Sequence, residues 1–252
     1  MVRCSSHAAR LRPFGRINRN GTGVGFGLLA AVALALSGCG NGSEEQSGLP
    51  MEDDFSGQCS WSETDDEQIR LACEGGEYTV LYRQVDGQPH HVMRQPVGEP
   101  VTSVSVEADA RLEAFPGGSN EDFQAYGVGC WATPVGGPGR GYLFIILPSL
   151  SAFAILLQDD ELAPEESLVF LVDEESDAVS PPGETTQIRA ECKAADDGVD
   201  LTMFLDGEEV GSASAPGEIG AAGFQAVGFS TFSARTGTDI RFDNFRAEEL
   251  GD

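Results

Sequence analysis

The chain has 252 residues, of which 41 are acidic and 15 are Lys or Arg, so its formal net charge is −26 at pH 7. A charge of this sign repels nucleic acid phosphates and anionic lipid headgroups, which argues against nucleic acid as a partner and against electrostatic membrane binding. The acids are dispersed in groups of two or three, a pattern typical of a well-solvated surface.

The first 38 residues have the pattern of an export signal. They contain five arginines and no acid, and an apolar stretch runs from Val24 to Leu36. That stretch is about a dozen residues, shorter than the roughly 20 needed for a permanent membrane-spanning helix. We expect residues 1–38 to be removed, which leaves ten basic residues against 41 acids and a mature net charge of −31.

The leader ends in the tetrapeptide Leu36-Ser37-Gly38-Cys39. This tetrapeptide resembles the lipobox of bacterial lipoproteins, and the resemblance implies cleavage before Cys39 and diacylation of its sulfur. The alternative is an ordinary secretory signal followed by a chance cysteine. Because two acyl chains hold a soluble domain stably at a membrane, we expect a lipid-anchored protein on the extracytoplasmic face of the cell membrane. Whether that face borders a periplasm or the exterior is left open.

The next segment, residues 40–50, is rich in Gly, Ser and Glu and has no hydrophobic period. Such a composition favours a flexible tether. We therefore divide the chain into a signal peptide over residues 1–38, a lipidated cysteine with its tether over residues 39–52, and a folded domain over residues 53–250.

Four cysteines follow the lipidated one: Cys59, Cys73, Cys130 and Cys192. Paired thiols persist in an exported protein, and four cysteines allow three pairings. Cys59 and Cys73 flank a short acidic segment suited to a local hairpin, whereas Cys130 and Cys192 lie in alternating, strand-like stretches. We predict the disulfides Cys59–Cys73 and Cys130–Cys192. A zinc site is the weaker reading, because no cysteine pair has close Cys-x-x-Cys spacing and the two mature histidines are adjacent.

The remaining sequence shows period-two alternation of apolar and polar residues, which is typical of short strands. The expected strands, in chain order, are residues 78–85, 101–112, 123–132, 142–147, 152–157, 167–172, 186–192, 199–205, 209–213, 221–232 and 238–246. Asp86-Gly87 is a hairpin signal, and Pro148 divides an apolar stretch into two strands where a membrane helix would otherwise be considered. With no convincing long amphipathic helix, the pattern predicts an all-β sandwich of two antiparallel sheets.

Short motifs also follow one another in a characteristic order. They include Asp53-Asp54-Phe55-Ser56, Tyr126-Gly127-Val128-Gly129-Cys130, Ile188-Arg189-Ala190-Glu191-Cys192, Phe204-Leu205-Asp206-Gly207 and Phe242-Asp243-Asn244-Phe245. Each motif alone is weak, but their order over residues 53–247 resembles the concanavalin A-like (laminin G-like) jelly-roll domains of bacterial surface lipoproteins. The resemblance implies a concanavalin A-like jelly roll, a fold often used for carbohydrate recognition, and supports the pairing of Cys130 with Cys192. A fold by itself does not establish that use.

Catalysis has little support in the sequence. Retaining glycosidases of this fold present Glu-x-Asp-x(-x)-Glu along one strand, and here Glu107 and Asp109 are followed by a third acid, Glu113, too far along. His90 and His91 have no nucleophile elbow nearby. We expect a non-catalytic binding or cell-envelope accessory module. The alternatives are a carbohydrate-active hydrolase with an unrecognised site and a purely structural interaction module.

A glycan or cell-wall polymer is the expected ligand class, since a sugar ring stacks readily on an exposed aromatic side chain. Trp131, Tyr126 and Trp61 are the candidate residues for such stacking. The competing interpretation is that these large aromatic side chains belong to the core.

A structural Ca²⁺ ion is a further possibility, because this ion takes several oxygen ligands. Sandwiches of this type often bring the first and last strands together, which would place Asp53 or Asp54 near Asp243 and Asn244. The alternative is that Asp243 and Asn244 end a strand and bond its backbone.

Overall fold

The structure is a computed structural model that describes residues 48–85, 90–114, 124–163, 166–217, 220 and 222–251. By its internal contacts the chain divides into Met1–Ser43 and Glu44–Asp252, and every described residue belongs to the second unit. Cys39, the expected signal peptide and nearly all of the expected tether therefore lie outside the described residues. No helix able to cross a membrane occurs within the described ranges.

Fifteen strands and one short 3-10 helix make up the described secondary structure. Nine strands form sheet A, in the order β13-β12-β11-β6-β15-β4-β3-β2, with β1 also paired to β15. Their bounds are β1 Met51–Asp53, β2 Thr64–Asp65, β3 Ile69–Glu74, β4 Glu77–Tyr82, β6 Ser103–Ala114, β11 Thr186–Ala195, β12 Gly198–Leu205, β13 Glu208–Pro216 and β15 Asp239–Glu249.

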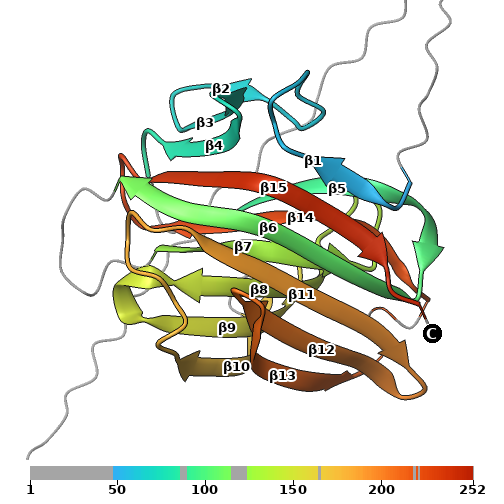
Figure 1. Cartoon of the computed structure of the whole chain (residues 1–252). Coiled ribbons are helices and arrows are strands. Elements are labelled where there is room, and N and C mark those ends of the chain that lie inside the picture. The colour runs from blue at the N-terminus through green and yellow to red at the C-terminus, as the bar shows by residue number, and fades with distance from the viewer. Residues whose placement is uncertain are drawn as a thin grey trace, which may run out of the picture. The chain divides into compact units, whose positions relative to one another are not determined.

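Six strands form sheet B, in the order β10-β9-β8-β7-β14-β5. Their bounds are β5 His90–Val101, β7 Gln124–Trp131, β8 Arg140–Leu147, β9 Ala152–Asp159, β10 Leu168–Glu175 and β14 Phe224–Ser233, and the 3-10 helix Pro148–Leu150 joins β8 to β9. Every pairing in both sheets is antiparallel, and Figure 1 shows the sheets as two layers. The predicted all-β sandwich is confirmed, and Pro148 separates two strands as expected.

The alternation of β6 illustrates how the sequence builds this sandwich. Val104, Val106, Ala108 and Ala110 are buried in the core between the sheets, while the residues between them face outward on sheet A. One apolar face and one wet face is the normal state of an antiparallel strand at the surface. Burial of the apolar face contributes roughly 25 cal/mol per Å² of surface removed from water.

Sheet B differs because its outward face is also apolar. Trp131, Leu143, Ile145 and Ala154 form a second buried cluster, separate from the core between the sheets. This explains why β8 and β9 are apolar along both faces, a pattern that alternation alone does not produce.

Two disulfides join distant parts of the chain, and both predicted pairings are confirmed. Cys59–Cys73 connects the segment after β1 to β3, with a sequence separation of 14 residues. Cys130–Cys192 connects β7 of sheet B to β11 of sheet A across the core, with a separation of 62 residues. The second disulfide therefore links the two layers directly.

The Asp-Gly pairs Asp86-Gly87 and Asp206-Gly207 are typical of hairpin turns, and the structure describes one of them. Asp206 and Gly207 connect β12 to β13 with φ values of 49° and 83°. Two successive positive φ values are what a two-residue hairpin turn requires, and Asp-Gly is among the pairs that adopt them most readily. The Asp86-Gly87 turn falls within residues 86–89, outside the described residues.

Candidate functional site

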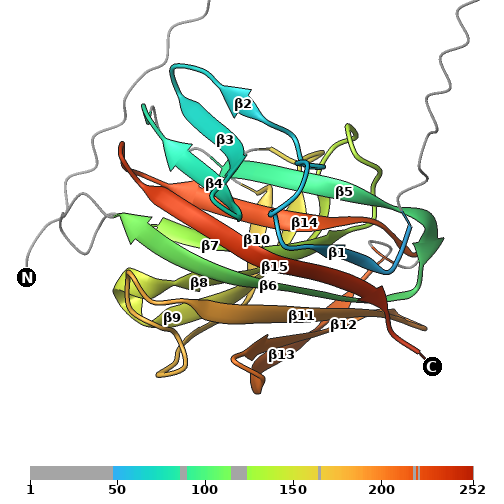
Figure 2. The ribbon, with the colours of Figure 1, turned by 45° about the horizontal axis from the view of Figure 1, so that its top comes forward.

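The first and last strands of the domain lie side by side, as the sequence predicts for this type of sandwich. Glu52 is paired with Arg246 and Asp53 with Phe245 across the β1–β15 ladder. Figures 1 and 2 both show β1 alongside β15. This pairing brings Asp53 and the following residue to the same region as the end of the chain, where the sequence has Asp243 and Asn244.

Asp53 organises the segment that follows it. One carboxylate oxygen accepts a hydrogen bond from the backbone N–H of Phe55 at 2.8 Å, and the other accepts from Ser60 Oγ at 2.9 Å and Trp61 Nε1 at 3.1 Å. These bonds fold residues 54–61 back over β1. Because a carboxylate holds such donors strongly, Asp53 acts here as a structural acceptor.

The folded segment places Trp61 in an aromatic cluster. Its ring stacks on Phe229 with centroids 4.5 Å apart and meets Phe245 edge-on at 4.8 Å. Phe55 packs beside it, with ring centroids 6.1 Å apart. Trp61 is only 5% exposed, so most of its surface stabilises the core and only an edge remains accessible.

A pocket of about 260 Å³ opens where β1, β5 and β15 meet beside Trp61. We call it the aromatic pocket, and it is lined by Pro50, Met51, Glu52, Asp53, Ser60, Trp61, Gln95 and Phe245. Gln95 reaches it from β5 and donates from Nε2 to the backbone carbonyl of Ser60 at 2.9 Å. That bond fixes the Gln95 amide in a wall that contains two aromatic side chains, Trp61 and Phe245.

A second pocket of about 260 Å³ shares part of this wall. We call it the acidic pocket, and it is lined by Glu52, Asp53, Asp54, Glu107, Asn244, Phe245 and Arg246. Asp54 accepts from both the hydroxyl and the backbone N–H of Ser56, and these bonds lower the pKa of its carboxyl group. Arg246 lies 3.6 Å from Glu52 and supplies positive charge at the border of the two pockets.

Asn244 lines the acidic pocket and Asp243 precedes it in the chain, at a bulge in β15. Asn244 has φ of 50°, donates its backbone N–H to Asp243 at 2.7 Å, and donates from Nδ2 to Asp109 at 2.8 Å. The pKa of Asp243 is raised, first by burial and then by the negative charges of Glu77, Asp109 and Asp54. The expected proximity of Asp54 and Asn244 therefore occurs, but the expectation that Asp243 and Asn244 end a strand is wrong, because β15 continues to Glu249 and the backbone bond forms at the bulge within it.

A metal centre has no ligand set in the part of the chain that the structure describes. No group of three or more His, Cys, Asp or Glu side chains there is arranged to hold a metal ion. Of the four residues considered for Ca²⁺, Asp53 already accepts three hydrogen bonds from within the protein. Neither observation supports a Ca²⁺ site at these residues.

Trp131 and Tyr126 lie on opposite faces of β7, away from the two pockets. Trp131 is 0% exposed on the outward face of sheet B, donates from Nε1 to Gln158 at 3.1 Å, and lies beneath the guanidinium of Arg94 at 5.9 Å. Tyr126 lies in the core, where burial raises the pKa of its hydroxyl. Stacking on a sugar requires an open ring face, and the structure buries the rings of Trp131 and Tyr126, along with most of Trp61.

The histidines occupy opposite faces of β5. The ring of His90 stacks on Phe232 at 4.0 Å, and its Nε2 lies 3.0 Å from the hydroxyl of the fully buried Ser230. Burial lowers the pKa of His90 to about 4, so its imidazole is neutral at pH 7. His91 meets Tyr82 edge-on. These surroundings make both histidines packing residues of a strand.

The outward face of β6 carries a charged stripe that consists of Glu107, Asp109, Arg111 and Glu113. Arg111 connects this stripe to neighbouring strands of sheet A. Arg111 forms ion pairs with Glu77 and Glu113, and Arg241 contacts the same Glu77 at 3.2 Å. An arginine held by two carboxylates compensates their charge, which is what a structural surface network does. The stripe gives no support to acid–base catalysis on this strand.

Comparisons with known proteins address the fold. The sequence matches no protein-family model and no curated protein. Among solved structures, the metal-free carbohydrate recognition domain of Emp46p has a TM-score of 0.54 at 11% identity, covering 82% of this chain and 98% of that one. A mutant of alginate lyase Aly36B in complex with alginate tetrasaccharide has a TM-score of 0.53 at 12% identity, covering 81% and 98%. These similarities show a jelly-roll β-sandwich fold.

Sequence reasoning missed part of the site. Gln95 and Ser60 carry no motif, and nothing in the chain signals that β5 would lie beside β1. The one useful signal was the expected meeting of first and last strands, which located Asp53 and Asn244 but not the pocket between β1 and β5.

Proposed function

We propose that this domain is a non-catalytic carbohydrate-binding module and that its sugar occupies the aromatic pocket. The fold is shared with a carbohydrate recognition domain and with a lyase that was solved with an oligosaccharide, which supports the ligand class. Fold similarity alone does not establish a function, so the proposal depends on the pocket.

The observation that carries the proposal is the chemistry of the pocket wall. The nearly buried rings of Trp61 and Phe245 and the polar side chains of Gln95 and Ser60 line the same cavity of about 260 Å³. A sugar has apolar C–H faces and polar hydroxyls, so it needs both kinds of wall close together. The pocket has room for a single sugar unit rather than a long chain of them.

Charge restricts the kind of sugar. Glu52 borders the aromatic pocket, Asp54 and Glu107 line the adjoining one, and the mature chain carries a large negative charge. A uronate would bring a further carboxylate into this field and be repelled. We therefore propose a neutral sugar or an amino sugar as the ligand.

A glycan array followed by titration of the best ligand tests the proposal. Gln95→Ala removes a polar group from the pocket and should weaken binding about tenfold, the loss expected for one good hydrogen bond. Gln225→Ala is the matched control, because Gln225 also donates from Nε2 to a backbone carbonyl, that of Ala132 at 2.7 Å, but lines neither pocket. The control should bind like the unmodified protein.

The competing functions predict different results in the same experiment. Release of new reducing ends from the array sugars would identify a carbohydrate-active hydrolase. Binding of no sugar at all would favour a structural interaction module. Equal loss of affinity in Gln95→Ala and Gln225→Ala would mean that the domain binds sugar but not at the aromatic pocket.

We also propose that the domain is held at the extracytoplasmic face of the cell membrane by acyl chains on Cys39, after removal of residues 1–38. The lipobox-like sequence supports this, and so do the two disulfides, because disulfides persist in oxidising compartments outside the cytosol. Metabolic labelling with a clickable fatty acid should mark the protein, and Cys39→Ser should abolish the label and release the domain into the soluble fraction. Labelling that persists in Cys39→Ser would place the lipid elsewhere.

A further inference from the structure

Strand β10 (Leu168–Glu175) ends sheet B and pairs only with β9 among the described strands. A strand in this position presents unpaired N–H and C=O groups that can accept another strand. Natural edge strands are usually protected by lysine, proline or an inward-pointing charge. The first half of β10, Leu168-Val169-Phe170-Leu171-Val172, contains no lysine, proline or charged residue, and the bulge between Phe170 and Val172 is the one protective feature in it.

The same strand carries exposed apolar side chains. Val169 is 44% exposed and Phe170 is 53% exposed, and Leu162 is exposed in the connection that leads into the strand. These three are most of the five large hydrophobic residues that are exposed in the described parts of the chain. Single exposed apolar residues are normal on a protein surface, whereas a group of them at one place marks an interaction site.

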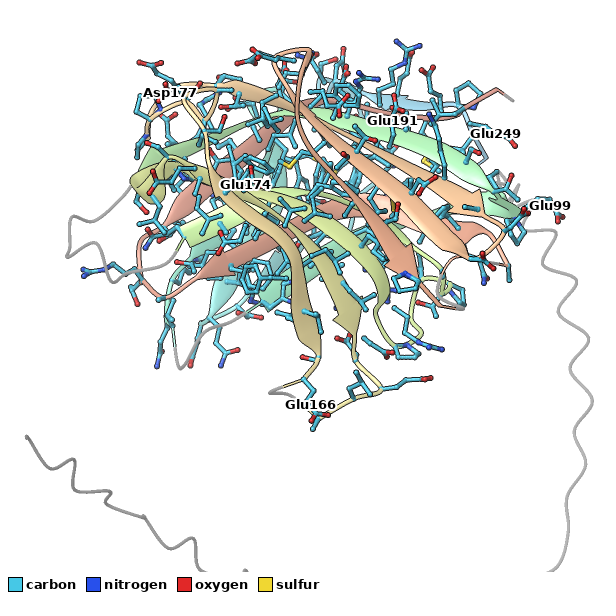
Figure 3. All side chains as sticks on the ribbon, turned by 90° about the horizontal axis from the view of Figure 1, so that it is seen from below. Glu99, Glu166, Glu174, Asp177, Glu191 and Glu249 are labelled. Carbon is cyan, nitrogen blue, oxygen red and sulfur yellow. A yellow bond between two sulfur atoms is a disulfide. The ribbon has the colours of Figure 1, made fainter. Side chains whose placement is uncertain are left out.

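The stretch of sequence that contains β10 is acidic, and Arg140 on β8 forms ion pairs with two of the acids that precede the strand, Asp159 and Glu161. Between Arg140 and Arg189 the chain contains ten acids and no Lys, Arg or His. Acids flank the strand at both ends, and Figure 3 labels Glu166 before it and Glu174 near its end. The excess of acids determines which kind of strand can pair with the edge of β10, because an added strand must carry positive charge to avoid repulsion.

A second copy of this chain fits the edge poorly. An antiparallel β10–β10 pair centred on Phe170 would place Glu174 opposite Glu166 of the second copy, with no basic residue between Arg140 and Arg189 of either copy to compensate them. Like charges placed directly opposite across a strand pair destabilise it. The complementary occupant is a different polypeptide.

We propose that β10 binds an extended segment of a partner protein, in which apolar residues alternate with Lys or Arg, as an added strand of sheet B. Backbone hydrogen bonds to the free edge supply much of the affinity in this mode, and side-chain contacts supply selectivity. Val169 and Phe170 provide the apolar contacts, and the flanking acids attract the basic residues. A bulge between Phe170 and Val172 limits the pairing to one side of that irregularity.

A synthetic peptide tests this without knowledge of the natural partner. The probe alternates valine and lysine over about ten residues, enough for one strand. A second peptide of identical sequence carries N-methyl groups on alternate backbone nitrogens, which keeps its charge but removes its edge hydrogen bonds. We expect the methylated peptide to bind the purified, disulfide-intact protein about tenfold more weakly in fluorescence anisotropy.

Matched variants locate the binding. Val169→Lys adds one positive charge at the edge, whereas Val135→Lys adds the same charge at a valine that is 48% exposed in the β7–β8 connection. We expect Val169→Lys to weaken peptide binding about tenfold and Val135→Lys to leave it within about twofold. Circular dichroism and an unchanged denaturant midpoint show that both variants are folded.

Three results would overturn the inference. Equal binding of the methylated and unmethylated peptides would mean attraction by charge alone. Equal effects of Val169→Lys and Val135→Lys would place the peptide elsewhere. A dimer of the unmodified protein in sedimentation analysis that Val169→Lys dissociates would make a second copy the occupant of the edge.

Discussion

At the scale of single residues, Asp53 controls the geometry of the site more than any other side chain. Its three hydrogen bonds join β1 to Ser60 and Trp61 and so shape the wall of the aromatic pocket. The sequence could place Asp53 at the start of the domain. It could not show that the carboxylate is used within the protein, because its partners lie seven and eight residues away in a segment with no regular structure.

Replacement of Asp53 by Asn tests this role. The amide would turn a donor toward the Ser60 hydroxyl and the Trp61 indole N–H, so we expect a loss of about 2 kcal/mol in the free energy of unfolding, within the range for hydrogen bonds to a charged group. Urea unfolding followed by tryptophan fluorescence measures it. Asp54→Asn is the control, because its bonds to Ser56 are local and exposed, and its midpoint should stay close to that of the unmodified protein. Equal losses in the two variants would contradict the assignment.

His90 makes stability depend on pH in a defined window. Burial lowers its pKa to about 4 from an ordinary 6.5, so the unfolded chain binds more protons than the folded one between these values. Stability from this residue is therefore complete above pH 6.5 and is lost as the pH falls toward 4, by up to about 3 kcal/mol. We expect the stability difference between the unmodified protein and His90→Gln to shrink steadily over this interval in urea titrations. Parallel curves from pH 7 to pH 4 would be inconsistent with a buried neutral imidazole.

The ionised carboxylate of Asp243 lowers the stability of the fold, whereas a carboxylate in an ion pair usually raises it. Its folded-state pKa is raised by burial and by neighbouring acids, so its ionised form destabilises the fold at neutral pH and its protonated form does not. Asp243→Asn keeps an acceptor for the Asn244 N–H and removes the charge. We expect it to increase stability by about 0.5 kcal/mol at pH 7, as for relief of a like-charge cross-strand pair, and to have no effect below the unfolded pKa of 3.8. Thermal unfolding at pH 7 and pH 3 checks both halves, and a loss of stability at pH 7 would contradict them.

At the scale of elements, alternation located the long strands well because their patterns are set by burial of one face. β6, β11 and β12 were predicted nearly in full for this reason. β1 and β2 have only three and two residues, too few for a pattern to emerge. β5 contains Pro96, Gly98 and Pro100, residues that usually interrupt a strand, so alternation did not predict one. It forms a strand because it pairs with β14.

The candidate site was harder to predict than the strands, because it depends on long-range neighbours. Trp61, Tyr126 and Trp131 are all large aromatic residues of the kind that stack on sugars. Whether such a residue is buried depends on which parts of the chain pack against it in the fold. The Trp61 edge that does reach a pocket is set by Asp53 and Phe229 together. Sequence patterns carry information about faces of one strand but not about which strands enclose a cavity.

At the scale of the whole molecule, the two disulfides stabilise different things. Cys130–Cys192 joins the sheets across 62 residues of chain, whereas Cys59–Cys73 spans 14 residues and holds the segment that carries Trp61. In the loop-entropy account, removal of the longer crosslink costs about 4 kcal/mol and removal of the shorter about 3 kcal/mol.

Paired alanine variants test this division. We expect Cys130→Ala with Cys192→Ala to lower the denaturant midpoint more than Cys59→Ala with Cys73→Ala does. Only the second pair should also weaken sugar binding, because it releases the wall of the aromatic pocket. A loss of sugar binding confined to the first pair would place the ligand nearer the junction of β7 and β11.

The central claim is that a sugar binds at the aromatic pocket beside β1, and hydrogen–deuterium exchange with and without the best array ligand tests it most directly. We predict that added sugar slows exchange in residues 51–61, around Gln95 in β5 and around Phe245 in β15, the segments that line the pocket. Exchange in β7 and β9 should not change. Protection confined to the outward face of sheet B around Trp131, with none beside β1, would contradict the account.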